Sequence, residues 1–203
     1  MAKVRWKGSA LLGPLPTVMV SCGDMEHPNI ITVAWAGIVN THPPKLSISV
    51  RPGRFSYGLI RESGEFVVNM TPTFLVKQAD FCGMYTGAKV NKFEKTGLTP
   101  VAASEVSCPM IEECPMSLEC RVTDVIPMGT HDLFLADIVA VHADEELLDE
   151  KGKLHVERAN LVAFAHGEYF ELGKCVGAFG DSVRKKPGGK KPAHHKKKTP
   201  NKK

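Results

Sequence analysis

The stretch 45-KLSISVRPG-53 alternates between apolar and polar side chains until Pro52-Gly53 interrupts it. Successive side chains of an extended strand point to opposite faces. One face therefore carries Leu46, Ile48 and Val50, and the other carries Ser47, Ser49 and Arg51. One apolar and one polar face is typical of a half-buried strand in an antiparallel sheet. We therefore predict a strand over residues 45–51.

Working outward, the sequence contains several more short apolar or alternating runs bounded by turn residues. We predict strands at 15–22, 29–39, 65–70, 117–126, 133–142 and 168–172. Short helices are expected at 55–62, ending at Ser63-Gly64, and from 71 to about 81, and the stretch 82–97 reads as a long polar loop. Many short strands with few helices favour a mainly β fold, an antiparallel barrel with short connecting helices.

The net charge of +4 comes from the end of the chain. Residues 184–203 hold ten Lys or Arg and no acid, whereas residues 1–183 hold 16 basic and 22 acidic residues, a net of −6. An acidic body argues against nucleic acid as the main partner, because phosphate backbones attract basic surfaces. We predict one domain over 1–183 followed by a disordered basic tail over 184–203.

Hydropathy argues against membrane insertion and against export. No window approaches 18 uninterrupted apolar residues, as a transmembrane helix requires. The basic and apolar start resembles a signal peptide, but Gly13, Pro14 and Pro16 interrupt its apolar stretch. We expect a cytoplasmic protein with no membrane partner.

Six cysteines are present, and none forms a Cys-x-x-Cys pair. Three of them recur every six residues (Cys108, Cys114 and Cys120), a spacing that would place all three on one face of a strand. We predict buried free thiols, as expected in a reducing compartment. The histidines show no metal-ligand spacing, so no metal site is predicted.

Two segments carry candidate anion-binding groups. Arg51 and Arg54 flank a Pro-Gly turn, and Ser56 lies in the first turn of the following helix. Free N–H groups at a helix start and planar guanidinium groups both suit a phosphate. Lys92, in the polar loop, is a candidate second contact. The alternatives are solvated arginines around an ordinary helix start and a surface lysine.

Other positions suggest a flat ligand. In the predicted strand 29–39, one face is mostly small (Ile30, Thr32, Ala34 and Ala36), which would let a flat ring approach closely. Trp35 and Phe164 are aromatic residues that could line such a ring, or could simply pack in a barrel core. His131 follows a Gly-Thr turn, where it could donate to a ligand oxygen or cap the backbone.

Taken together, these motifs resemble a known family. The segments 28-PNIITVAW-35 and 43-PPKLSISVRP-52 and the loop from Gly87 to Lys92-Phe93 are similar to the flavin reductase-like, FMN-binding split-barrel family, most of all to its flavoredoxin branch. The segments 111-IEECP-115, 118-LEC-120 and 172-LGKCVGAFG-180 continue the similarity, which covers about residues 8–184.

The resemblance implies a homodimer of split, Greek-key antiparallel β-barrels with non-covalent FMN near the dimer interface. It places Asn29, Thr32, Ala34 and Trp35 around the isoalloxazine ring, and Arg51, Ser56 and Lys92 around the phosphate. His131 and Phe164 match positions that contact the flavin, and Ser49, on the strand of Arg51, completes the predicted set. No catalytic residue is assigned.

The implied activity is that of an oxidoreductase that transfers electrons through bound FMN, with NAD(P)H or a small redox protein as donor. One alternative is an NAD(P)H-dependent flavin reductase that releases reduced flavin, and the sequence carries no nicotinamide fingerprint that would decide between them. A second alternative is a non-catalytic flavin-binding module whose basic tail docks to a partner.

Overall fold

The computed structural model describes residues 1–183. Contacts between residues divide the chain into a compact unit, Met1–Leu172, and a second unit, Gly173–Lys203. The described part of the second unit, residues 173–183, contains turns and no helix or strand. The predicted tail lies outside the described residues, and the predicted domain boundary at 183 stays a prediction.

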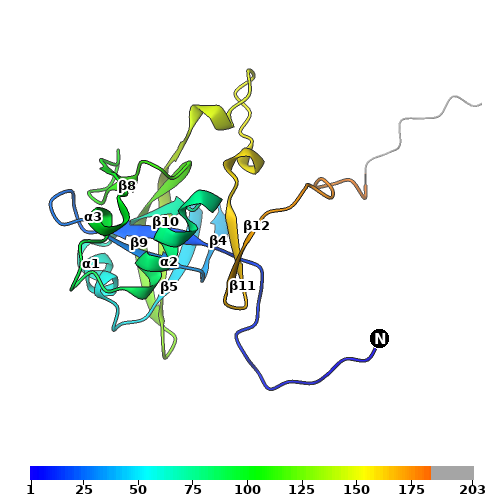
Figure 1. Cartoon of the computed structure of the whole chain (residues 1–203), viewed down its shortest axis with the longest axis horizontal. Helices are drawn as coiled ribbons and strands as arrows, with labels where there is room; N and C mark the ends of the chain where they lie inside the picture. Colours follow the sequence, from blue (N-terminus) through cyan, green and yellow to red (C-terminus); the bar gives the residue numbers. More distant parts are fainter. Residues whose placement is uncertain (184–203) are drawn as a thin grey trace, which may run out of the picture. The chain divides into compact units, whose positions relative to one another are not determined.

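The first unit is built around a seven-stranded sheet in which all paired neighbours are antiparallel (Figure 1). In spatial order its strands are β3 (Asn29–Val33), β2 (Val18–Cys22), β6 (Glu65–Met70), β9 (Met116–Pro127), β10 (Asp132–Ala143), β5 (Pro44–Val50) and β4 (Ala36–Thr41). The two smaller sheets are β1 (Leu15–Pro16), β11 (Val162–Ala165) and β12 (Glu168–Glu171), and β7 (Pro100–Val101) with β8 (Met110–Ile111). The predicted mainly β, antiparallel fold is confirmed.

The helices are short connections between strands. They are α1 (Phe55–Ser63), α2 (Val76–Met84), α3 (Lys92–Thr96) and the 3₁₀ turns Thr73–Leu75, Glu145–Leu147 and Val156–Ala159. Helix α1 ends where predicted, because Gly64 adopts a left-handed conformation (φ 70°) that side chains disfavour. The predicted loop over 82–97 is wrong in part, since α2 continues to Met84 and α3 begins at Lys92 after an Asn91 cap.

The predicted single strand over 29–39 is also wrong. The chain bends at Ala34-Trp35, so that β3 pairs with β2 while β4 pairs with β5. The Trp35 carbonyl still accepts a hydrogen bond from the Ser49 amide at 2.9 Å, which holds the bend against β5. The bend removes Ala34 and Trp35 from the ladder, and the Trp35 side chain is 43% exposed.

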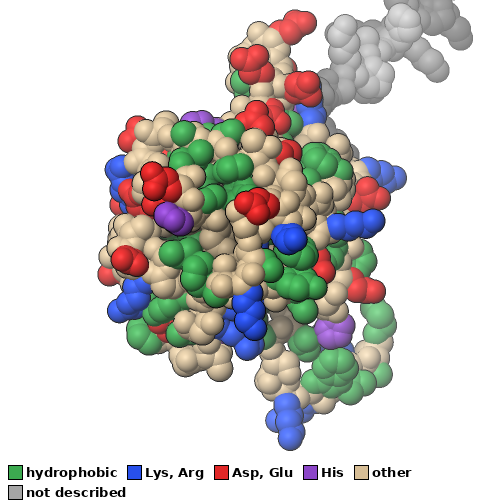
Figure 2. All heavy atoms as spheres, turned by 60° about the vertical axis from the view of Figure 1, so that its left-hand side comes forward, with side chains coloured by type: hydrophobic (Ala, Val, Ile, Leu, Met, Phe, Trp, Pro, Cys, Tyr) green, Lys and Arg blue, Asp and Glu red, His purple; other side chains and the backbone are tan. Residues whose placement is uncertain are grey.

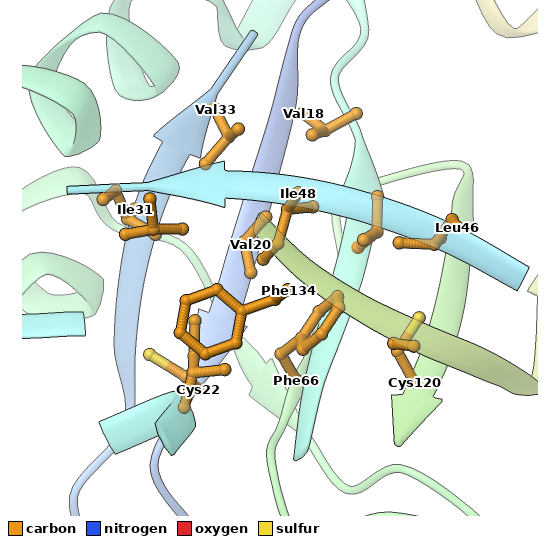
Figure 3. Packing of buried hydrophobic residues seen from close by; sticks show 14 residues of the cluster. Val18, Val20, Cys22, Ile31, Val33, Leu46, Ile48, Phe66, Cys120 and Phe134 are labelled. Atoms are coloured by element: carbon orange, nitrogen blue, oxygen red, sulfur yellow. The ribbon is translucent and has the colours of Figure 1, made fainter. Parts of the chain in front are cut away.

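The main core lies inside the curved sheet. Figure 3 shows Phe66 and Phe134 side by side, with Ile48 from β5 and Val20 from β2 beside them. The three apolar residues of the alternating strand are at most 4% exposed, as their spacing predicts: Leu46, Ile48 and Val50. A second cluster fills the space between β3 and the helices, with Ile30, Ala79 and Phe93 among its members. Strand β3 is therefore buried on both faces, and α2 packs against one of them.

The cysteines are free, as predicted, and five of the six are buried; the prediction of burial is wrong for Cys175, which is exposed. The expected common strand face for Cys108, Cys114 and Cys120 is wrong, because only Cys120 lies on a long strand, β9. The three thiols belong to three different apolar clusters. Burial raises the pKa of Cys22 and Cys82 to about 11 each, so these thiols stay protonated near neutral pH.

Candidate functional site

An open pocket of about 740 Å³ lies where β3 and β5 end. That volume is within the ~300–1,000 Å³ range of small-molecule sites. Six of the predicted site residues do line it: Thr32, Ala34, Trp35, Ser49, Arg51 and His131. Thr32 lies on β3 and Ala34 and Trp35 in the bend that follows it, Ser49 and Arg51 lie at the end of β5, and His131 lies in the turn before β10. Segments far apart in the sequence thus meet in one pocket.

One wall of the pocket is cationic. Arg51 and Arg54 flank the Pro52-Gly53 turn, and both line the pocket. The Arg54 guanidinium donates a hydrogen bond to the Gly83 carbonyl at the end of α2. Because Arg54 directly precedes α1, this bond ties the start of α1 to the end of α2. Two positive charges beside a helix start favour an anion at this wall.

Beside Arg51, two aromatic rings line the pocket. The rings of Trp35 and His131 lie 4.6 Å apart between centroids, tilted by 47°. The His131 ring also contacts polar neighbours: its Nδ1 lies 3.0 Å from the Thr130 Oγ1, and its Nε2 accepts a hydrogen bond of 3.4 Å from the Arg51 Nε. Burial and the Arg51 charge lower the pKa of His131.

Lys92 is not the exposed loop lysine that its polar surroundings suggest. Its side chain is part of a residue only 2% exposed, and its Nζ donates to the carbonyls of Ile30 (2.6 Å) and Cys82 (2.7 Å). Within residues 1–183, no carboxylate forms an ion pair with this ammonium group. Burial, with a smaller effect of Arg54, lowers the pKa of Lys92 to about 8.

Asn29 and Ser56 form a buried pair between β3 and α1. Asn29 Nδ2 donates to the Ser56 Oγ at 2.7 Å and also contacts the Cys22 Sγ at 3.6 Å. Ser56 lies in the first turn of α1 and is 2% exposed. Gly87 is held close to this pair, since a Cβ there would lie 2.1 Å from the Asn29 Oδ1. Asn29, Ser56 and Lys92 are thus interior groups and do not line the open pocket.

Two other predicted residues have roles of their own. The Thr32 hydroxyl donates to the Ala79 carbonyl, which fastens β3 to α2 and leaves only its oxygen lone pairs for a ligand. Phe164, on β11, lines a neighbouring cavity of about 610 Å³ and packs against Tyr169 at 5.5 Å between centroids. That cavity shares Trp35 with the main pocket, so Trp35 separates the two.

Sequence reasoning left several lining residues out of the predicted set. Arg54 was identified with Arg51 as a candidate anion-binding residue but was not included in the predicted set. Its position three residues after Arg51 could have indicated that it lines the same pocket. Gly83 and Thr130 gave no comparable signal, because only the tertiary structure brings the end of α2 and the turn before β10 to the pocket.

Figure 2 shows Lys and Arg side chains scattered among Asp and Glu on the visible face of the described residues, rather than gathered into one broad basic surface. Residues 1–183 contain no cluster of His, Cys, Asp and Glu suited to a metal ion. They also contain no helix with the length and apolar character needed to span a membrane.

Comparison with known proteins identifies similar chains. The family model for the flavin reductase like domain matches residues 13–173. An uncharacterized protein of Archaeoglobus fulgidus is 37% identical over 140 residues, which are 69% of this chain and 78% of that protein. An NADPH-flavin oxidoreductase of Streptomyces viridifaciens is 27% identical over 146 residues, 70% of this chain and 74% of that protein.

Solved structures of two flavoredoxins are also similar to this chain. The flavoredoxin of Desulfovibrio vulgaris (Miyazaki F) superimposes with a TM-score of 0.84 at 30% identity, covering 90% of this chain and 100% of that chain. The flavoredoxin from Methanosarcina acetivorans gives a TM-score of 0.81 at 27% identity, covering 91% of this chain and 100% of that chain.

Proposed function

This chain belongs to the flavin reductase-like domain family, and we propose that its cofactor is FMN, bound in the pocket between Trp35 and the arginine corner. The chain is a flavin-dependent oxidoreductase. When bound, the flavin supplies the redox chemistry by accepting and passing on electrons, while the protein orients it and tunes its surroundings.

The observation that favours FMN over a flavin without a phosphate is the buried Lys92 ammonium group. A charged group taken out of water needs a compensating charge, and no carboxylate among residues 1–183 pairs with this one. The Ser56 hydroxyl lies in the first turn of α1, where free N–H groups favour an anion. Lys92 does not line the open pocket, so the phosphate dianion of a flavin bound there would have to enter between α1 and α2 to supply the missing negative charge.

The residues present fit the rest of the cofactor. Ala34 is small and Trp35 is flat and half-exposed, which suits a planar, partly apolar ring. Arg51 and Arg54 add positive charge at the wall that faces solvent. The buried Asn29–Ser56 hydrogen bond holds the start of α1 against β3. It therefore fixes the position of the free N–H groups at the start of α1 that would bind the phosphate.

The direct test compares FMN with riboflavin, which lacks the phosphate. We expect the purified protein to bind FMN with a change in visible absorbance and to prefer it over riboflavin. In Lys92→Met we expect roughly a 10- to 100-fold loss of FMN affinity, because a hydrogen bond to a charged group contributes about 1.5–3 kcal/mol. Riboflavin affinity should change little. Lys89→Met, in the exposed loop, is the matched control.

The proposal fails in two ways. A protein that binds neither flavin has no flavin site in this pocket. Equal loss of FMN and riboflavin affinity in Lys92→Met would assign the lysine to structural support of β3 and α2, through its bonds to Ile30 and Cys82, and would remove the argument for FMN.

We propose further that the protein is a homodimer with an electron donor that is either NAD(P)H or a small redox protein. Support for a dimer comes from β4, an edge strand with Ile38 64% and Val39 52% exposed, since exposed apolar edges mark association surfaces. Light scattering measures the oligomeric state. Rapid bleaching of bound flavin by NADH or NADPH would support the reductase, and bleaching only by a reduced redox protein would support the electron carrier.

A further inference from the structure

Both ring nitrogens of His131 have partners at the edge of the pocket. The Arg51 Nε lies 3.4 Å from the His131 Nε2, and the Thr130 Oγ1 lies 3.0 Å from the Nδ1. All three residues line the pocket, and the Trp35 ring packs against the imidazole at a tilt of 47°. The ring is therefore held on three sides before any ligand is considered.

The identity of these partners fixes the protonation of the ring. A guanidinium can only donate hydrogen bonds, so the Nε2 must accept from Arg51 through its lone pair. An imidazole that accepts at Nε2 carries its proton at Nδ1 and is neutral. The Nδ1–H then donates to the Thr130 hydroxyl oxygen. His131 in this arrangement has no proton on the nitrogen that faces Arg51.

We infer that His131 is a positioning residue that, as a neutral Nδ1–H imidazole, holds the Arg51 guanidinium at the wall of the flavin pocket, and that protonating His131 releases it. This inference rests on the proposed function, because Arg51 matters only if an anionic flavin binds there. It assigns His131 a role different from that of a proton donor to a ligand.

The charged groups around His131 support a neutral ring. Arg51 faces it directly from the turn after β5, and Arg54 lines the same pocket from the start of α1. The nearest carboxylate along the chain, Asp132, accepts a hydrogen bond from the Tyr57 hydroxyl at 2.7 Å, and Arg61 donates to that hydroxyl at 3.1 Å. The lowered pKa of His131, caused by burial and by Arg51, agrees with this geometry.

The consequence for flavin binding has a definite sign. When His131 is protonated, its Nε2–H faces the Arg51 N–H, so two donors and two positive charges oppose each other. The hydrogen bond is lost and Arg51 moves away from the wall. FMN affinity should then fall at low pH by roughly three- to tenfold beyond the loss due to protonation of the phosphate itself, which also titrates near pH 6.

The test measures the dissociation constant of FMN at pH 7.5 and pH 5.0 in the wild type, His131→Gln and His131→Phe. Glutamine keeps an acceptor oxygen for Arg51 but does not titrate. Phenylalanine keeps a ring against Trp35 but has no acceptor. The phosphate contributes equally in all three, so it cancels from the comparison.

We expect the wild type to lose roughly three- to tenfold more affinity than His131→Gln on going to pH 5.0. His131→Phe should bind FMN roughly three- to tenfold more weakly than the wild type at pH 7.5, and His131→Gln should bind nearly as well as the wild type. Superimposable pH profiles for the wild type and His131→Gln would overturn the inference. So would a wild type that gains affinity relative to His131→Gln at low pH, since a protonated ring would then attract the anion directly.

A measurement without FMN keeps the inference separate from the proposed function. A two-bond proton–nitrogen correlation spectrum of the wild type at pH 7.5 distinguishes the Nδ1–H from the Nε2–H imidazole. The Nδ1–H form supports the inference and the Nε2–H form overturns it, whatever the flavin result. Absence of FMN binding in the wild type would instead overturn the proposed function.

Discussion

The replacement Glu119→Gln tests how one buried charge holds the loop between β7 and β8 to strand β9. Glu119 lies on β9 and has no exposed surface. Its Oε1 accepts hydrogen bonds from the Ser104 amide (2.8 Å) and hydroxyl (2.7 Å) and contacts the His142 Nε2 (2.5 Å). Its Oε2 accepts from the amides of Glu105 (2.6 Å) and Val106 (3.0 Å). The carboxylate thus holds residues 104–106 of the loop against β9.

Glutamine cannot replace this carboxylate, because it offers only one acceptor oxygen. Whichever way its amide is turned, the NH₂ group faces at least two donors. The pKa of Glu119 reflects the same contacts: burial alone would raise it, but the hydrogen bonds from Ser104, Glu105 and His142 outweigh burial and hold it at about 2. Compared with an ordinary value of 4.5, this corresponds to roughly 3 kcal/mol of folding free energy at pH 7.

We therefore expect Glu119→Gln to lower the free energy of unfolding at pH 7 by about 3 kcal/mol, or Tm by roughly 6–12 °C for a domain of this size. Urea unfolding followed by circular dichroism measures the difference, with Glu168→Gln on exposed β12 as the control. FMN affinity should not change, because residues 104–106 do not line the pocket.

The contribution of Glu119 to folding stability depends on pH in a predictable direction. The folded pKa of Glu119 lies below the unfolded one, so its contribution is complete above about pH 4.5 and is lost as the pH falls toward 2. The wild type and Glu119→Gln should therefore converge in stability at low pH. Two proteins that unfold at the same urea concentration at pH 7 would refute this account of the carboxylate.

Gly87→Ala should weaken FMN binding at least tenfold with only a modest loss of stability, because its Cβ would meet the Asn29 Oδ1 at 2.1 Å and displace the Asn29–Ser56 pair; fluorescence titration measures it, and unchanged affinity would show that this pair does not support the site. Gly58→Ala, with no heavy atom within 4 Å of the new Cβ, should instead stabilise α1 by roughly 0.5–1 kcal/mol without affecting FMN, as thermal unfolding would report. A thiol reagent should modify Cys175 first in the native protein, since the other cysteines are buried; several thiols reacting equally fast would contradict the buried arrangement.

Local pattern was enough to predict most of the elements. The alternation in residues 45–51 specified a strand and its buried face, because a period of two leaves only one way to bury three apolar side chains together. The end of α1 was also readable, since Gly64 tolerates a left-handed conformation. The family motifs extended this to the fold class and to the flavin chemistry.

The sequence did not predict how segments that are distant along the chain pack together. Residues 29–39 carry one continuous strand pattern, yet two different pairing partners split them at Trp35 and turn that side chain into the pocket. Lys92 lies in a polar stretch that indicates exposure, yet the carbonyls of Ile30 and Cys82 draw its ammonium inside. The sequence therefore indicated most of the strands and named the groups predicted to bind a phosphate. Only the tertiary structure decided which of those groups are buried and what they face, because burial and hydrogen-bond partners depend on contacts between residues far apart in the chain.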